Sequence, residues 1–224
     1  MSELPTIAII GGTGAEGSGL AVRLAHAGHT VILGSRSAEK AATVAAELNQ
    51  IAGGERIRGS ANVAATAAAS IVLLTVPFAG QMQTLREIAP QLAGKILVDV
   101  TVPLVPPKVN RVQLPAEGSC VAIAQRELGE SVRVVSAFQN VSAHKLRKLD
   151  AKVECDVLVC ADDPEARRTV MALIEAIGLR GINAGPLANS AAAEALTSVL
   201  IWINRTYKVP DAGIAITGLP RSEG

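Results

Sequence analysis

The sequence predicts an α/β protein with a doubly wound parallel sheet, in which helices cover both faces of the strands. Short apolar runs alternate with longer helical patterns along most of the 224 residues. The runs are continuously apolar, as at residues 71–75, which is typical of strands buried on both faces. Hydrophobic residues make up 49% of the chain and aromatic residues only 2%. Small side chains therefore dominate, which suits helices packed closely on a sheet, and the composition excludes a disordered chain.

The first hundred residues are expected to hold five strands, at residues 6–10, 30–33, near 57, 71–75 and 96–100. Four helices are expected after the first four of them, at residues 17–27, 38–52, from 62, and 77–92. Ser37 is a suitable N-cap for the second helix, and Gly53 is a suitable end for it. Gly28 likewise ends the first helix.

The second half begins with an extended loop, because prolines stand at positions 103, 106, 107 and 115. The later elements expected are a helix at 119–128, a strand at 132–137, a strand at 156–160, a helix at 164–177, a strand at 179–183, a helix at 189–207 and a possible strand at 214–217. Residues 138–152 have little periodicity, and a shift in composition there marks the boundary between two units.

Composition and charge exclude several classes of partner. The 21 Lys and Arg residues nearly balance the 20 Asp and Glu residues, so we expect no nucleic-acid partner. The apolar runs are far shorter than the roughly 20 residues of a membrane span, and the N-terminus lacks the basic region of a signal peptide. The three cysteines are expected to be reduced thiols without metal-site spacing. We therefore expect a cytoplasmic protein with no membrane partner.

Residues 12–17 read Gly-Thr-Gly-Ala-Glu-Gly, which matches the pattern G-x-G-x-x-G. The pattern follows the first predicted strand and opens the first helix, which is the context that dinucleotide binding requires. Glycines such as Gly12 and Gly14 allow a tight turn and a close approach of the backbone to a pyrophosphate. The start of the helix then offers free N–H groups to the phosphates. We predict a dinucleotide site here.

The end of the second strand predicts NADP(H) as the dinucleotide. An NAD site has an Asp or Glu there, which accepts a hydrogen bond from the ribose 2′-OH. This chain instead has Ser35 and Arg36, with Lys40 one helical turn further on. A hydroxyl, a guanidinium and an ammonium group suit a 2′-phosphate. Thr13 could add a second hydroxyl.

No catalytic side chain is evident from the pattern. The fourth and fifth strands end in apolar and small residues that suit a flat nicotinamide ring, and Phe78 stands on that edge of the sheet as either ligand wall or core. His26 and His29 are expected on the surface, and the role of His144 stays open. Neither a Ser-His-Asp order nor metal-ligand spacing is found. Hydride transfer between two bound cofactors needs mainly proximity and orientation, so such chemistry is compatible with this absence.

Several longer marks occur in one order over nearly the whole chain. They are the turn at 11–17, residues 34–36 with Lys40, residues 75–77 followed by an aromatic residue, and residues 134–137, 156–159, 184–190 and 204–208. Through these marks the chain resembles the NADPH-dependent coenzyme F420 reductases, also called F420H2:NADP oxidoreductases.

The resemblance implies a Rossmann-type NADP-binding domain at residues 1–140 and a small C-terminal α/β domain at residues 141–224 that closes the substrate cleft. In such proteins the positions matching Thr13, Gly14, Ala15 and Glu16 hold the pyrophosphate. Those matching Ser35, Arg36 and Lys40 hold the 2′-phosphate. Those matching Val76, Phe78, Val102 and Ala143 lie along the nicotinamide. The deazaflavin of F420 stacks on that ring and exchanges a hydride with it directly, without an acid or base residue. A homodimer is also implied.

One departure from the family pattern concerns the second substrate. Family members usually carry one or two histidines after the sixth strand, where this chain has Gln139 and Asn140. These amides can donate hydrogen bonds to a carbonyl-rich ring, but they do not titrate near neutral pH. The departure bears on the second substrate more than on the NADP site, and the resemblance as a whole still implies F420. A flavin or another small acceptor, or a non-catalytic NADPH sensor, remains an alternative.

Overall fold

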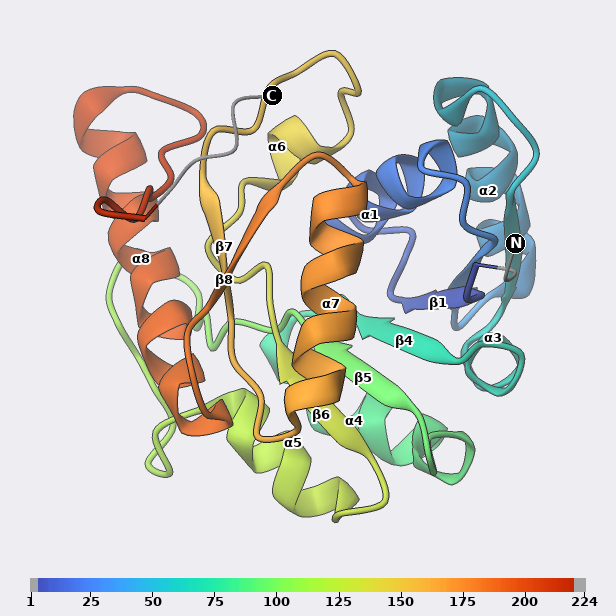
Figure 1. Ribbon diagram of the computed structural model, residues 1–224, viewed down its shortest axis with the longest axis horizontal. Helices are drawn as coiled ribbons and strands as arrows, with labels where there is room; N and C mark the ends of the chain where they lie inside the picture. The colour runs from blue at the N-terminus through green and yellow to red at the C-terminus, as the bar shows by residue number, and fades with distance from the viewer. Residues whose placement is uncertain (1–3, 220–224) are drawn as a thin grey trace.

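The computed structural model describes residues 4–219, so the outer ends of both predicted domains lie outside it. It contains a six-stranded sheet of order β3-β2-β1-β4-β5-β6 and a two-stranded sheet, β7-β8 (Figure 1). The strands of the larger sheet are β1 (Ile7–Ile10), β2 (Val31–Ser35), β3 (Ile57–Ala61), β4 (Ile71–Leu74), β5 (Ile96–Asp99) and β6 (Arg133–Ser136). All of its neighbouring strands are parallel. The order reverses between β1 and β4, as in Rossmann folds, which confirms the predicted fold class.

Side chains that alternate along β1, β2, β4, β5 and β6 enter two separate cores. On one face, Ile7 and Ile9 of β1 belong to a core with buried side chains of α1 (Ala15–His26), α2 (Ala38–Ala52) and α7 (Pro164–Ala176). On the other face, Ala8 and Ile10 belong to a core with α3 (Asn62–Ala67), α4 (Phe78–Ile88) and α5 (Cys120–Leu128). The continuously apolar strands thus have the two buried faces that the sequence predicts.

The part of the chain after β6 contains short elements and one long helix. In chain order they are α6 (Ala143–Leu146), β7 (Asp156–Val159), α7, β8 (Arg180–Asn183), the 3₁₀ turn η2 (Leu187–Asn189) and α8 (Ser190–Tyr207). In Figure 1 α8 stands at the left edge of the molecule, away from the six-stranded sheet. The buried carboxylate of Glu194 joins it to the rest: it accepts hydrogen bonds from the Ser119 hydroxyl (2.6 Å) and the Cys120 backbone N–H (2.9 Å) at the start of α5. The Cys120 N–H is one of the backbone donors that the start of a helix leaves without an intrahelical partner.

Most predicted boundaries lie within two residues of those observed. The helix at 38–52 has the predicted bounds, and the Ser37 hydroxyl accepts a hydrogen bond from the Lys40 backbone N–H at its start. The predicted helix at 77–92 is longer than observed. The α-helix ends at Ile88, and a 3₁₀ turn, η1 (Ala89–Gln91), follows, because Pro90 has no N–H to continue the α-helical pattern.

Two expectations are wrong. Residues 214–217 do not form a strand. The Ile216 N–H donates to the Asp156 carboxylate (2.6 Å) rather than to a strand carbonyl, so no ladder develops. His29 was expected on the surface but is 3% exposed, and its ring Nδ1 lies 3.2 Å from the Pro5 carbonyl oxygen. It directly follows Gly28, whose positive φ turns the chain back toward the start of β1.

The buried guanidinium of Arg23 in α1 holds the irregular segment after β6 in place. It donates hydrogen bonds to five backbone carbonyls, those of Lys145, Leu146, Lys148, Ala151 and Ile177, at 2.8 to 3.4 Å. Four of the five belong to α6 and the turn after it, and the fifth belongs to the end of α7. One side chain therefore donates to carbonyls at the ends of short turns and helices, of which those of Lys145 and Lys148 also accept a backbone N–H.

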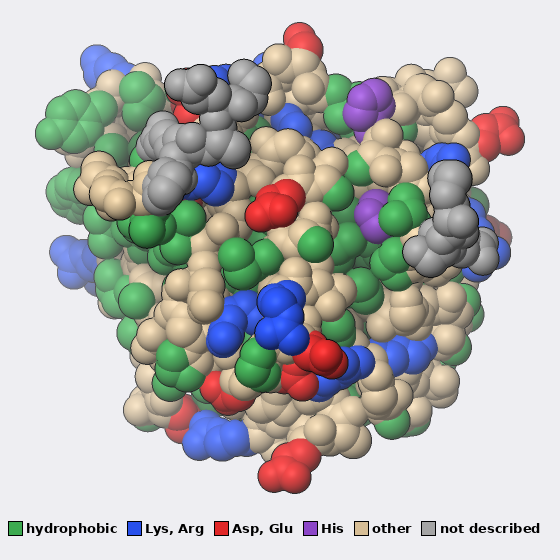
Figure 2. All heavy atoms as spheres, viewed as in Figure 1, with side chains coloured by type: hydrophobic (Ala, Val, Ile, Leu, Met, Phe, Trp, Pro, Cys, Tyr) green, Lys and Arg blue, Asp and Glu red, His purple; other side chains and the backbone are tan. Residues whose placement is uncertain are grey.

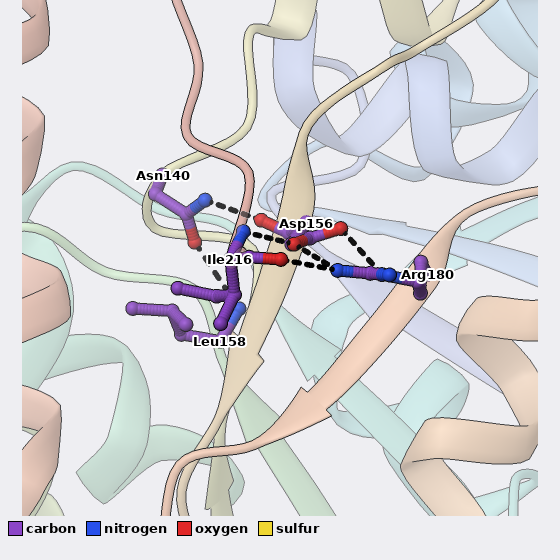
Figure 3. Close-up of polar contacts among 5 residues, drawn as sticks. All are labelled: Asn140, Asp156, Leu158, Arg180 and Ile216. Carbon is purple, nitrogen blue, oxygen red and sulfur yellow. Dashed lines mark hydrogen bonds and ion pairs between the residues drawn. The ribbon is translucent and has the colours of Figure 1, made fainter. Parts of the chain in front are cut away.

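A second polar cluster attaches the C-terminal segment to β7 and β8 (Figure 3). The Arg180 guanidinium makes a bidentate contact with the Asp156 carboxylate at 2.6 and 2.7 Å. This contact raises the pKa of Arg180. Asn140 bridges the same region, because its side chain donates to the Asp156 carbonyl (2.6 Å) and accepts from the Leu158 N–H (3.3 Å). The loop after β6, the small sheet and the segment around Ile216 are thus joined by one cluster of hydrogen bonds.

Replacing Arg23 should destabilise the fold more than replacing an exposed arginine. We expect Arg23→Ala to lower the free energy of unfolding by about 3 kcal/mol, because it leaves buried carbonyls without donors. Urea denaturation measures the change. Arg168→Ala is the matched control. The Arg168 side chain is 68% exposed, and its ion-pair contact with Glu165 is long, at 3.8 Å. Equal losses in the two variants would contradict this role of Arg23.

Candidate functional site

A cavity of about 1050 Å³ lies where the strand order reverses, at the carboxyl ends of β1 and β4. Its wall is formed by the glycine turn, the end of β2, the start of α4 and the loop after β5. All of its lining residues fall between positions 11 and 109. Ligands of open α/β sheets bind at this position. The cavity is therefore the candidate cofactor site.

The glycines of the turn have different physical roles. A Cβ atom on Gly12 would lie 2.7 Å from the Ile9 carbonyl oxygen, and one on Gly17 would lie 2.6 Å from Thr75 Oγ1. These two glycines let α1 pack against the strands. A Cβ on Gly14 would meet only the Gly11 carbonyl oxygen, at 3.3 Å. Gly14 is exposed and lines the cavity, so its missing side chain leaves space for a ligand rather than for the fold.

The end of β2 places basic and hydroxyl side chains at one end of the cavity wall. Ser35, Arg36 and Lys40 all line it, as predicted. Arg36 and Lys40 are exposed, and neither takes part in an ion pair among residues 4–219. Their charges are therefore available to an anionic ligand. Asn62 at the start of α3 also lines this part.

The ends of β4 and β5 form a mostly apolar part of the wall. Val76, Phe78 and Val102 line the cavity, and Phe78 is half-buried there. Sequence reasoning missed two further groups of lining residues. One is Gln83, Thr84 and Glu87 on α4, and the other is Leu104, Pro106 and Val109 in the loop after β5. The helical spacing of the first group was a usable signal. The second depends on how the proline-containing loop folds back.

The cavity wall is also where the structure leaves polar atoms unpaired. Among residues 4–219, five side-chain atoms are buried without a hydrogen-bond partner. Two of them, Glu16 Oε1 and Asn62 Oδ1, belong to residues that line the cavity and have no polar group of the protein assigned to them. Buried polar groups in folded proteins are usually paired, so each exception calls for an explanation. The unpaired oxygens of Glu16 and Asn62, together with the open approach at Gly14, fit a polar ligand such as a dinucleotide.

A buried acid lies beneath the wall at the end of β5. Burial raises the pKa of Asp99 to about 6, although hydrogen bonds from Thr101 and Gln81 oppose the rise. The Gln81 side-chain amide donates to the carboxylate at 2.6 Å. Gln139 donates its own amide to the Asp99 backbone carbonyl at 2.7 Å. Asp99 thus braces β5, α4 and the loop after β6 rather than lining the cavity.

Gln139 and Asn140 are not placed as the sequence suggested. From the sequence, their amides could donate to a substrate ring. The structure buries both residues, at 3% and 2% exposure, and their amide nitrogens donate to the carbonyls of Asp99 and Asp156. Neither residue lines the cavity. Their role in the structure is to join the loop to β5 and β7.

The structure brings ten of the twelve predicted cofactor-binding residues to the cavity wall. The exceptions are Gly12, which is buried beneath the turn, and Ala143 at the start of α6. His144 is exposed and does not line the cavity either. Within residues 4–219, no cluster of three His, Cys, Asp or Glu side chains could hold a metal ion, and no helix is long and apolar enough to cross a membrane.

Comparison with known proteins gives consistent matches. The family described as NADP oxidoreductase, coenzyme F420-dependent, matches residues 6–103. The F420-dependent NADP reductase of Methanothermobacter thermautotrophicus is 44% identical over 97% of both chains. That of Methanocaldococcus jannaschii is 41% identical, over 95% of this chain and 98% of the relative. A crystal structure assigned as an F420-dependent NADP reductase from Arthrobacter sp. FB24 is 28% identical, with a TM-score of 0.78, and the match covers 95% of this chain and all of that chain.

Gly14→Val should remove dinucleotide binding while leaving the fold intact. The valine side chain would occupy the ligand's side of the turn, where the fold itself leaves room. We expect no fluorescence change on titration with NADPH and a thermal midpoint within a few degrees of the unchanged protein. Gly17→Val is the matched control, because its side chain would collide with Thr75 and lower the midpoint. Normal NADPH binding by Gly14→Val would contradict the assignment.

Proposed function

The chain belongs to the family of F420-dependent NADP reductases, and on this premise we propose that it transfers a hydride between NADP(H) and coenzyme F420. The observation that carries the proposal is one cavity that combines a phosphate-binding turn, unpaired basic groups and an apolar wall. The full-length relatives of the same family make this an NADP-dependent oxidoreductase.

The proposed placement of NADP(H) follows from the chemistry of the wall. The N–H groups at the start of α1 would face the pyrophosphate beside Gly14. Ser35, Arg36 and Lys40 would hold the 2′-phosphate, because a guanidinium and an ammonium group bind a phosphate strongly in a site with no competing carboxylate partner. The side chains that would hold the ligand are thus on rigid elements, since β2 and α2 are packed into the core.

The nicotinamide end would lie against Val76, Phe78 and Val102. Bound F420 would accept or supply the hydride at its deazaflavin ring. The chain's own contribution is to hold the two rings together and to keep water away with apolar side chains. Among the lining residues the structure offers no histidine or cysteine for acid–base chemistry, which suits a direct hydride transfer.

The second unit, residues 141–224, and the assembly are also part of the proposal. We propose that these residues help to close the site over F420 and that the protein is a cytoplasmic homodimer without a nucleic-acid partner. Exposed apolar side chains of α8 support an interface: Val199 is 43%, Trp202 55% and Tyr207 72% exposed. Figure 2 shows hydrophobic side chains gathered along the left edge, over α8. A monomeric mass in sedimentation equilibrium would contradict the dimer.

Stopped-flow absorbance with NADPH and F420 tests the hydride transfer. We expect rapid loss of the F420 absorbance band on mixing, and no comparable reaction when FMN replaces F420. Reaction with FMN alone would favour a flavin reductase. NADPH binding without reduction of either acceptor would favour a non-catalytic sensor.

Arg36→Ala in the same assay tests the choice of dinucleotide. Loss of the guanidinium should weaken NADPH binding by about 1.5–3 kcal/mol, roughly 10- to 150-fold, and leave NADH binding unchanged. Arg168→Ala, on α7 and outside the cavity, should change neither affinity. Equal weakening of NADPH and NADH would show that Arg36 does not contact the 2′-phosphate.

A further inference from the structure

We propose that the protonation state of Glu16 controls how tightly the cavity binds its dinucleotide: the neutral carboxyl group admits the pyrophosphate and the carboxylate repels it. This inference rests on the proposed function only in taking NADPH as the ligand. Glu16 is the second residue of α1 and lines the cavity within the same turn as Thr13 and Gly14. Glu16 thus belongs to the first turn of the helix whose N–H groups would face the phosphates.

The carboxyl group of Glu16 has none of the contacts that stabilise a carboxylate. Its Oε1 is buried with no hydrogen-bond partner. An acid in the first turn of a helix often accepts a backbone N–H or caps the helix, but the N-cap of α1 is Gly14, and no side chain caps this helix start. No ion pair among residues 4–219 involves Glu16. Burial without compensation raises its pKa to about 8.

The basic side chains on the elements packed against α1 do not pair with Glu16, because they bind other groups or are exposed. Of the groups on packed elements, Arg23 of α1 is bonded to five carbonyls, and Lys145 of α6 is paired with Asp211 at 2.6 Å. His144 of α6 is exposed. Cys155, directly before β7, is a further titratable group near Glu16. Burial raises the pKa of its thiol, and a negative charge on Glu16 would add to the rise.

The cavity wall itself brings three charged side chains besides Glu16. Arg36 and Lys40 belong to the end of β2 and the start of α2, and Glu87 belongs to α4. All three are exposed. The cause of the raised pKa of Glu16 is burial alone, so none of these groups supplies the cation that an ionised Glu16 would need.

The effect on binding has a definite sign. Below pH 8 the carboxyl group is protonated and carries no charge, so it adds nothing to the charge of the pyrophosphate. Above pH 8 it is ionised, and two anions then share one helix start. A bound anion favours the neutral form of Glu16, so binding takes up a proton where the free protein has lost it. Affinity for NADPH should therefore fall as pH rises through 8.

The experiment is an NADPH fluorescence titration at pH 7 and pH 9. For a group that titrates at about 8, the dissociation constant of the unchanged protein should rise about tenfold over this interval. Glu16→Gln cannot ionise and should show a nearly flat profile, with an affinity at pH 9 close to that of the unchanged protein at pH 7. Glu165→Gln is the matched control, because Glu165 occupies the first turn of α7 and its side chain is 78% exposed. It should behave like the unchanged protein.

Proton uptake provides a second readout that needs no variant. Calorimetry between pH 7 and pH 9, in buffers of different ionisation enthalpy, should show proton uptake on NADPH binding that increases with pH, because a growing fraction of the Glu16 carboxyl groups is ionised in the free protein. The 2′-phosphate contributes little to this proton uptake, because its second pKa is about 6 and it is already ionised. Zero uptake, or parallel pH profiles in the unchanged protein and Glu16→Gln, would overturn the inference. Both readouts measure binding, so a failure to reduce F420 would leave them decisive.

Discussion

One buried guanidinium, that of Arg23, joins the sheet-forming part of the chain to everything after β6. Burying a cation is costly unless hydrogen bonds replace its hydration. Here five backbone carbonyls do so without a carboxylate. The same contacts satisfy an irregular stretch of backbone around α6 that has few partners of its own. Because Arg23 lies on α1, it also fixes the helix whose first turn forms part of the cavity wall.

The other buried polar groups divide into those that hold the fold together and those that lie at the cavity wall. Asp99, Asp156 and Glu194 are paired with amides, a guanidinium or the start of a helix. Each of them connects segments that are far apart in the sequence. By contrast, the cavity-lining residues Glu16 and Asn62 each have a buried oxygen with no partner. Because buried polar groups are usually paired, the unpaired oxygens of Glu16 and Asn62 at this wall are consistent with a ligand that completes it.

The proposed function depends on this separation between polar groups that hold the fold together and polar groups that stay free at the cavity wall. The chemistry of hydride transfer belongs to the two cofactors, so the protein needs to bind and align them. In the proposed site, the rigid β-strand ends and the glycine turn would provide the alignment, and the basic side chains at the end of β2 would distinguish NADP(H) from NAD(H). A neutral Glu16 completes the same arrangement, because it keeps a second negative charge away from the phosphates at neutral pH.

Local patterns in the sequence were sufficient for the fold and for most of the cofactor site. Continuously apolar runs are a direct consequence of burial on both faces, and a helix N-cap such as Ser37 acts within its own turn. For the same reason, the glycine turn and the basic residues after β2 were identified with their neighbours in the chain. They are short-range features, and the parallel strand order then brings their ends together.

The tertiary structure alone decided what depends on contacts between distant segments. By their position in the sequence, Gln139 and Asn140 could have been substrate ligands. In the structure their side-chain amides donate to backbone carbonyls of β5 and β7. The sequence predicted His29 on the surface. The turn at Gly28 instead buries it, with its ring next to the Pro5 carbonyl. The raised pKa of Glu16 could not be read from a glycine motif, because burial is set by the packing around α1. Sequence thus determined which groups are available, and the packing of remote segments determined which of them stay free for a ligand.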